Sequence, residues 1–257
     1  MLWYKSFLET RWRFLIGLAV LVLSVVGTVF AYPRVVRLLP LVPTTAEADG
    51  SSLLAQRISE IADLSHTYRG YVWVQALRQN VTQMLSLFAV LLGSGGLLSS
   101  AKGGSLFTLS LPVSRTRLLG VRAATGLAEL AALAVIPLLL LPLMSPAVGA
   151  QYAIADALVH GVCFFVASAV LFSLTSLLST VFHDTWRPVM IVCLLAATLG
   201  IAEPFFGDLS RYSLFGIMDG EIYFRGGGVP WLEWLATAGV SAALLFAASR
   251  NFARQDF

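Results

Sequence analysis

The sequence has little charge and few of the residues from which soluble active sites are built. Of its 257 residues only 12% are charged, whereas an average soluble domain has about 25%. Hydrophobic residues make up 58% of the chain, and the mean hydropathy is +0.81. This balance excludes an ordinary water-soluble domain. We expect one integral membrane domain over residues 1–257.

Familiar catalytic motifs are also missing. The chain has no HExxH, GxSxG or GxGxxG motif, and neither lysine follows the glycine spacing of a phosphate-binding loop. The histidines His66, His160 and His183 fall on separate segments, and Cys163 and Cys193 lie inside apolar runs rather than in a CxxC pair. The sequence therefore predicts no enzyme, no cofactor or metal bound by this chain itself, and no nucleic-acid partner.

Long apolar runs are what the chain has in abundance. A bilayer core requires about 20 consecutive, mostly apolar helical residues. Six segments meet this requirement: residues 14–32, 72–98, 118–144, 154–182, 188–206 and 231–248. The expected fold is therefore an all-α integral membrane protein with six transmembrane helices.

The distribution of basic residues predicts the orientation of these spans. An even number of spans leaves both termini on one side, and the side richer in lysine and arginine is cytoplasmic. If both termini are cytoplasmic, the inside segments hold ten basic residues and three acids, a net charge of +7, whereas the outside segments are net acidic. We therefore expect cytoplasmic N- and C-termini.

Two segments outside the spans have distinctive compositions. Residues 1–13 place Trp3 and Phe7 on one helical face and Lys5, Glu9 and Arg13 on another. This pattern predicts an amphipathic N-terminal helix on the inner surface, or alternatively an extension of the first span into the headgroups. Residues 206–230 are aromatic, glycine-rich and acidic, which favours a re-entrant or interfacial outer segment before the last span.

A cytoplasmic segment between the second and third spans, "SSAKGGSLFTLSLPVSRTRLLGVR", combines apolar and basic residues. Its glycines allow a bend, Pro112 breaks the helix, and Ser114 can cap the helix of the third span. Its apolar residues are Leu106, Phe107, Leu109 and Leu111. The simpler interpretation is a basic turn whose only role is to fix the orientation of the neighbouring spans. However, an apolar pattern that faces water usually marks a contact surface, so we expect a short amphipathic helix joined rigidly to the third span.

The same segment resembles the first cytoplasmic loop of type-2 ABC exporter permeases. That loop has a glycine-containing turn, a Leu-Leu-x-Leu-Pro-x-Ser-Arg run and then the third span, and "LFTLSLPVSRTRLLGVR" is similar to it. The C-terminal "LLFAASRNFARQDF" is similar to the ending of the class, Phe-x-Arg-x-Asp plus an apolar residue. One departure is that many members carry acids before the glycine turn, where this chain has Ala101, Lys102, Gly103 and Gly104.

This resemblance implies a permease subunit of an ATP-driven exporter in the bacterial cytoplasmic (inner) membrane. Residues 100–111 would form a coupling helix that docks on a separate ATP-binding subunit. That subunit, and not this chain, would bind ATP and Mg²⁺. The complex would hold two such subunits and a second permease chain, expected to be identical, within membrane lipid. The residues implied in coupling are Lys102, Ser105, Leu106, Phe107, Leu109, Leu111, Pro112, Arg115 and Arg117. The alternative is a noncatalytic membrane-anchoring or immunity-type protein without an ATPase partner.

The second span carries a polar stripe formed by Gln75, Arg78, Thr82 and Ser86, which recur at spacings of three and four residues. Polar groups are costly in lipid and usually face protein or water. We therefore predict that the stripe lies in the translocation path or at a subunit interface. The alternative is a shallow outer helix end exposed to water.

Glu129 is an isolated acid inside the third span. It lies seven residues after Arg122, which places both on one face of the helix. Either the two side chains meet by snorkelling, or Glu129 has a polar partner on another helix. A structural pair is favoured over a substrate contact.

Overall fold

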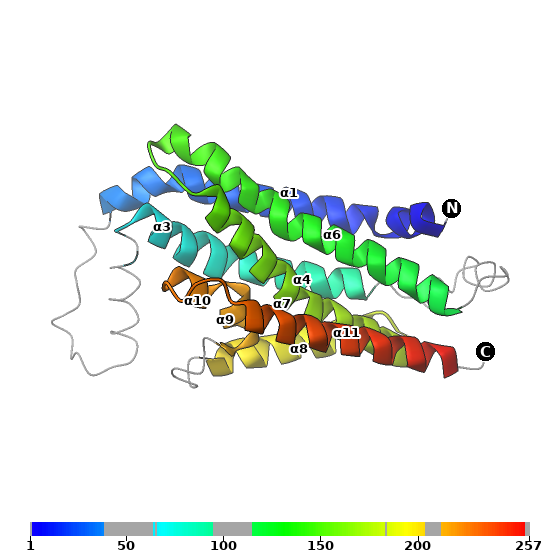
Figure 1. The fold of residues 1–257 in the computed structure, drawn as a ribbon. Coiled ribbons are helices and arrows are strands. Elements are labelled where there is room, and N and C mark those ends of the chain that lie inside the picture. The colour runs from blue at the N-terminus through cyan, green and yellow to red at the C-terminus, as the bar shows by residue number, and fades with distance from the viewer. Residues whose placement is uncertain are drawn as a thin grey trace.

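The computed structural model describes residues 2–38, 64, 66–94, 115–182, 184–203 and 212–254, and these residues form helices and turns without a strand. The helices lie alongside one another in an elongated bundle (Figure 1). They are α1 (Leu2–Leu38), α3 (Tyr68–Tyr71), the π-helical η3 (Val72–Val81), α4 (Thr82–Gly93), α6 (Arg115–Met144), the short 3₁₀ turn η4 (Ser145–Val148), α7 (Ile154–Val181), α8 (Trp186–Ala202), α9 (Leu214–Met218), α10 (Glu221–Phe224) and α11 (Trp231–Arg254).

Four of the described helices are long and apolar enough to cross a membrane. They cover Trp3–Arg37, Arg117–Val148, Ile154–Val181 and Trp231–Arg254, with 24 to 35 residues each. At 1.5 Å per residue, even the shortest extends about 36 Å, more than the roughly 30 Å of bilayer hydrocarbon. The all-helical prediction is thus confirmed for the described residues, and these four candidate spans correspond to the first, third, fourth and sixth predicted spans.

The second and fifth predicted spans differ from these four. The second is built from α3, η3 and α4, which follow one another without a break and together contain 26 residues. The fifth corresponds to α8, an apolar helix of only 17 residues. Residues 95–98 and 204–206, which the sequence adds to these spans, lie outside the described residues.

The N-terminal residues do not form a separate surface helix. Instead, α1 continues unbroken from Leu2 to Leu38, so the prediction of a distinct amphipathic helix is corrected in favour of an extended first span. The bundle holds this extension in place, because Thr10 is buried and Arg13 Nη1 donates a hydrogen bond to the carbonyl of Leu91 at 2.6 Å. The helix also passes through Pro33, where the sequence predicted its end.

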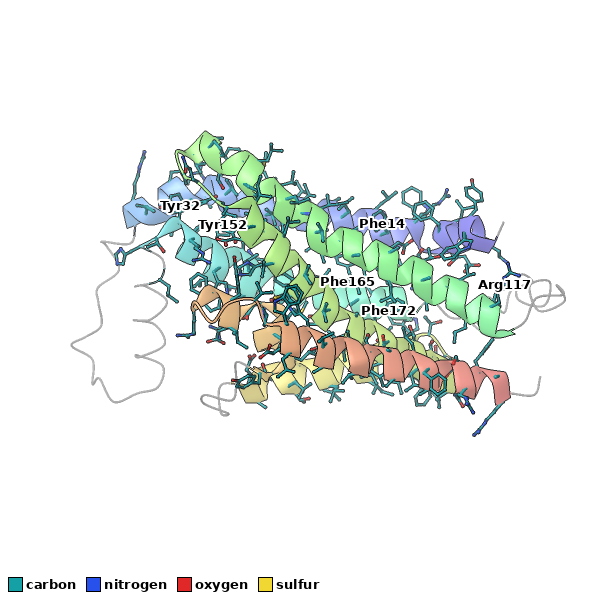
Figure 2. The ribbon with its side chains drawn as sticks, in the orientation of Figure 1. Phe14, Tyr32, Arg117, Tyr152, Phe165 and Phe172 are labelled. Atoms are coloured by element: carbon teal, nitrogen blue, oxygen red, sulfur yellow. The ribbon has the colours of Figure 1, made fainter. Side chains whose placement is uncertain are left out.

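Helix α7 is the centre of the bundle. It contacts α4, α6, α8, α9 and α11, and Phe165 and Phe172 project from its middle (Figure 2). Glycine allows two of these contacts to be close. A Cβ at Gly93 of α4 would lie 2.5 Å from the carbonyl oxygen of Phe172, and one at Gly126 of α6 would lie 2.6 Å from the Phe172 ring.

The segment before α11 folds back onto the bundle. Helices α9 and α10 are joined at Gly220, whose φ of 68° favours glycine. Met218 and Asp219 are buried, and the Phe224 ring stacks on Trp73 of η3 with centroids 4.3 Å apart. This segment is therefore part of the helical assembly rather than a solvated loop.

Candidate functional site

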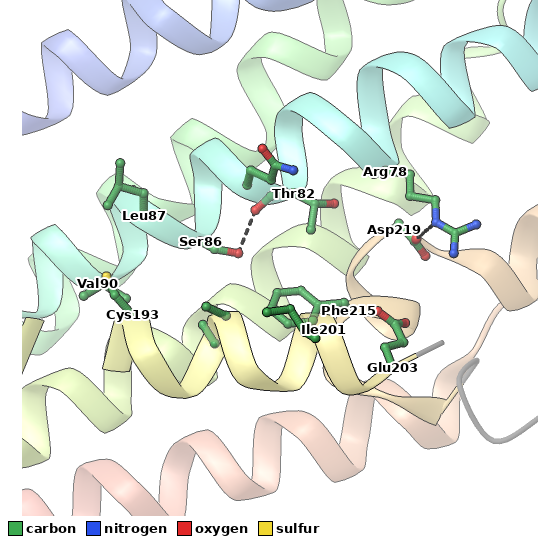
Figure 3. Close-up of a pocket in the computed structure, with 14 residues that line it drawn as sticks. Arg78, Thr82, Ser86, Leu87, Val90, Cys193, Ile201, Glu203, Phe215 and Asp219 are labelled. Carbon is green, nitrogen blue, oxygen red and sulfur yellow. Dashed lines mark hydrogen bonds and ion pairs between the residues drawn. The ribbon is translucent and has the colours of Figure 1, made fainter. Parts of the chain in front are cut away.

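A pocket of about 570 Å³ lies between η3–α4, α8 and α9 (Figure 3). Arg78, Thr82 and Ser86 form one wall together with the apolar Leu87 and Val90. The opposite wall belongs to α8, and α9 contributes Phe215. Clefts of this volume are typical of sites for small molecules.

The pocket exists because the two halves of α8 pack differently. The buried residues of α8, Pro188, Val189 and Val192, all belong to its N-terminal half. Beyond them, the wall of the pocket is formed mainly by small residues of α8, including Ala197 and Gly200. The C-terminal half of α8 therefore leaves space between itself and α4.

An ion pair lies at one end of the pocket. Arg78 Nε is 3.7 Å from Asp219 Oδ2, and the guanidinium also lies 5.4 Å from the centroid of the Trp73 ring. Asp219 is only 3% exposed, and its other oxygen accepts a hydrogen bond from the backbone N–H of Glu221. Burial raises the pKa of Asp219, while the charge of Arg78 opposes this rise.

Glu203 brings a second carboxylate to the same end. It follows the last turn of α8 and is half-buried. Its Oε1 accepts a hydrogen bond of 2.6 Å from Ser213, whose hydroxyl also caps α9 by accepting from the backbone N–H of Gly216. The ion pairs formed among the described residues do not include Glu203.

The two hydroxyl groups of the stripe donate to their own helix. Thr82 Oγ1 donates to the carbonyl of Leu77 at 2.9 Å, five residues earlier, as the wide turn of η3 permits. Ser86 Oγ lies 2.6 Å from the carbonyl of Thr82. Because each hydroxyl has a single proton, the oxygens offer the pocket mainly hydrogen-bond acceptors.

The structure brings part of the predicted stripe together with residues that the sequence did not single out. Arg78, Thr82 and Ser86 line the pocket, whereas Gln75 is half-buried and does not. Asp219 and Glu203 were not predicted as site residues. The one signal for Asp219 was its place in an acidic, aromatic outer segment.

Glu129 lies away from this pocket, at the contact between α1 and α6. Thr10 Oγ1 donates to Glu129 Oε1 at 2.5 Å, and Glu129 is 5% exposed. Arg122 instead lies near Glu9, with Nη1 and Oε2 3.8 Å apart. Of the two predicted arrangements, the structure therefore has the one with a polar partner on another helix.

The coupling segment is described only at its end. Lys102, Ser105, Leu106, Phe107, Leu109, Leu111 and Pro112 lie outside the described residues. Helix α6 begins at Arg115, and Arg117 in its first turn is exposed, at the same end of the bundle as both termini (Figures 1 and 2). The docking role of this segment stays a prediction.

Comparisons of the chain with protein-family models, with curated proteins and with solved structures give no match.

Proposed function

We propose that this chain is the permease subunit of an ATP-driven ABC exporter, working with a second copy of itself and two separate ATP-binding subunits. The observation that carries the proposal is the pocket within the helical bundle, because Arg78, Thr82 and Ser86 of the predicted polar stripe line it. A polar-lined pocket among apolar helices suits a protein that moves a solute. An anchoring or immunity-type protein has no need of one.

The proposal includes six spans with both termini in the cytoplasm. The 16 α-helical residues of α3 and α4 would extend about 24 Å, and the ten residues of η3 between them lengthen the run further. Helix α8 would extend about 26 Å, at the lower limit for a transmembrane helix. Both termini and the start of α6 lie at one end of the bundle (Figure 1). This supports an even number of crossings, and the basic segments assign that end to the cytoplasm.

The helices on either side of the coupling segment suggest how force reaches the pocket. Helix α4 precedes the segment and contributes one wall of the pocket, while α6 follows it and is bonded to α1 through Glu129 and Thr10. A displacement of the segment by a closing ATPase pair would therefore move α4 and α6 together. Because α8 faces the pocket from a different part of the chain, such movement would change the separation of the two walls.

Photo-crosslinking tests the partner directly. A photo-reactive amino acid replaces Phe107 in cells, and the crosslinked protein is identified by mass spectrometry and by ATP binding. We expect an ATP-binding protein. The control position is Phe246 of α11, which is exposed and is expected to crosslink to lipid. Absence of an ATP-binding protein at Phe107 would favour the anchoring or immunity-type alternative.

A further inference from the structure

The pocket is polar at one end and apolar at the other. Arg78, Asp219 and Glu203 gather at one end, whereas Val90 and Cys193 lie at the opposite end (Figure 3). A ligand that fills the pocket along its length therefore requires a polar head and an apolar body.

The charges of the polar end favour a positive head. The lining residues include one cation and two carboxylates, and the cation, Arg78, pairs with Asp219, so Glu203 is the lining carboxylate without a paired cation among the described residues. Arg78 is already engaged by Asp219 at 3.7 Å and by the ring of Trp73 at 5.4 Å. Glu203 has the hydroxyl of Ser213 as its hydrogen-bond donor. A half-buried carboxylate next to apolar surroundings gains from a nearby cation more than it would in water.

Hydrogen bonding in the middle of the pocket also favours a protonated amine. Thr82 and Ser86 direct their hydroxyl protons to backbone carbonyls of their own helix, and their oxygens retain lone pairs. Together with the Glu203 carboxylate at one end, these oxygens make the pocket rich in hydrogen-bond acceptors. Such a surface fits the N–H groups of a protonated amine better than an anionic or carbonyl-rich head.

The geometry points to an amphipathic monocation as the ligand of this pocket. Its protonated amine lies near Glu203, and its apolar body passes Thr82 and Ser86 toward Leu87, Val90 and Cys193 (Figure 3). This inference names the substrate class of the proposed exporter and rests on that function as far as transport is concerned. Binding itself requires only this chain and can be measured without an ATPase.

Three matched fluorescent probes test the charge preference. Dansylcadaverine carries a primary ammonium, N-dansyl-5-aminopentanol is neutral, and N-dansyl-6-aminohexanoic acid is anionic. Their binding to the full-length chain in phosphatidylcholine nanodiscs is followed by dansyl fluorescence. We expect the cation to bind about tenfold more tightly than the other two, which corresponds to about 1.4 kcal/mol. Equal affinities for the three probes would overturn the proposal.

Variants at Glu203, which follows α8, and on two faces of α8 locate the binding. Glu203→Gln can still accept from Ser213, so we expect it to weaken only the cationic probe, by about tenfold. Ala197→Phe fills the pocket and is expected to weaken both the cationic and the neutral probe. Leu199→Phe is the control, because Leu199 is exposed and does not line the pocket. Cation binding that survives both Glu203→Gln and Ala197→Phe would contradict the assignment.

Competition separates a soluble amine from a lipid headgroup. Dodecylamine is expected to displace dansylcadaverine more strongly than lysophosphatidylethanolamine does, because the second is zwitterionic. Stronger displacement by the lysolipid would overturn the monocation class.

If dansylcadaverine binds as expected but Phe107 crosslinks to no ATPase, the exporter function fails while the binding site stands. If Phe107 crosslinks to an ATPase but dansylcadaverine does not bind as expected, the proposed ligand class is wrong while the exporter function stands.

Discussion

At the scale of single residues, each buried acid in the described membrane helices and the outer segment has an identifiable partner. Glu129 accepts from Thr10, and Asp219 pairs with Arg78. A buried charge without a partner is destabilising, so these contacts matter more through the cost of losing them than through their net attraction.

The Arg78–Asp219 pair makes the first prediction. Arg78→Gln leaves a buried carboxylate without its cation, and we expect a loss of about 1–3 kcal/mol, reduced from the fully buried case because Arg78 is 36% exposed. Adding Asp219→Asn should restore most of the stability that Arg78→Gln loses, because the carboxylate is then neutral. Thermal unfolding in detergent of Arg78→Gln, Asp219→Asn and the double variant measures these losses of stability. A loss in the double variant equal to the sum of the two single losses would refute the pairing.

The same variant has a predicted pH dependence. Burial raises the pKa of Asp219, so the folded state binds a proton more readily than the unfolded chain does. In Arg78→Gln the loss of stability should be greatest above that raised pKa and should diminish as the pH falls below it. Unfolding scans over a pH series check the sign, and a loss that grows with acidity would contradict it.

The Thr10–Glu129 contact makes the second residue-scale prediction. Thr10→Val keeps the shape but removes the donor to Glu129, and we expect a loss of about 1–2 kcal/mol in unfolding free energy. Thr198→Val is the matched control, because Thr198 is exposed and bonds only the carbonyl of Leu195 among described residues. Equal unfolding temperatures for both variants would show that the contact has no structural role.

At the scale of elements, the turn between α9 and α10 fixes Asp219 at the pocket. Gly220 has φ of 68°, and a Cβ there would lie 3.0 Å from His160 Cδ2. Trp73 Nε1 donates to the carbonyl of Asp219 at 3.0 Å, so the turn is held on both sides. The position of the charged end of the pocket therefore depends on this turn.

A pair of glycine variants tests that dependence. Gly220→Ala introduces both a left-handed alanine and a close contact, and we expect a loss of about 2 kcal/mol. Gly149→Ala is the control, because Gly149 has φ of 71° with nothing within 4 Å of its Cβ, so it reports the backbone strain alone. Unfolding temperatures no lower for Gly220→Ala than for Gly149→Ala would exclude the contact with His160.

Elements that depend on local composition could be predicted from the sequence, and elements that depend on distant contacts could not. The starts of α7 at Ile154 and of α11 at Trp231 and the end of α6 at Met144 agree with the predicted spans. The extension of α1 depends on contacts with α4 and α6, and the π-helical form of η3 has no sequence signal known to us. Likewise the stripe of Arg78, Thr82 and Ser86 was readable from its periodicity, but the pairing of Arg78 with a residue 141 positions later was not.

At the scale of the whole molecule, α4 connects the pocket to the segment on which the proposed ATPase partner acts. The pocket walls belong to α4 and α8, and the segment that precedes α6 begins where α4 ends. Motion at that segment reaches the pocket without crossing a flexible linker among the described residues of α4. The central claim is that ATP hydrolysis by a partner drives this motion.

The most direct test of that claim is ATP-dependent uptake of dansylcadaverine into inside-out proteoliposomes that contain the complex purified through this chain. The account predicts uptake that requires ATP, that is retained in Phe107→Leu, and that is lost in Phe107→Asp while the chain still inserts. Uptake and ATP hydrolysis in Phe107→Asp equal to those of the unaltered protein would contradict the account.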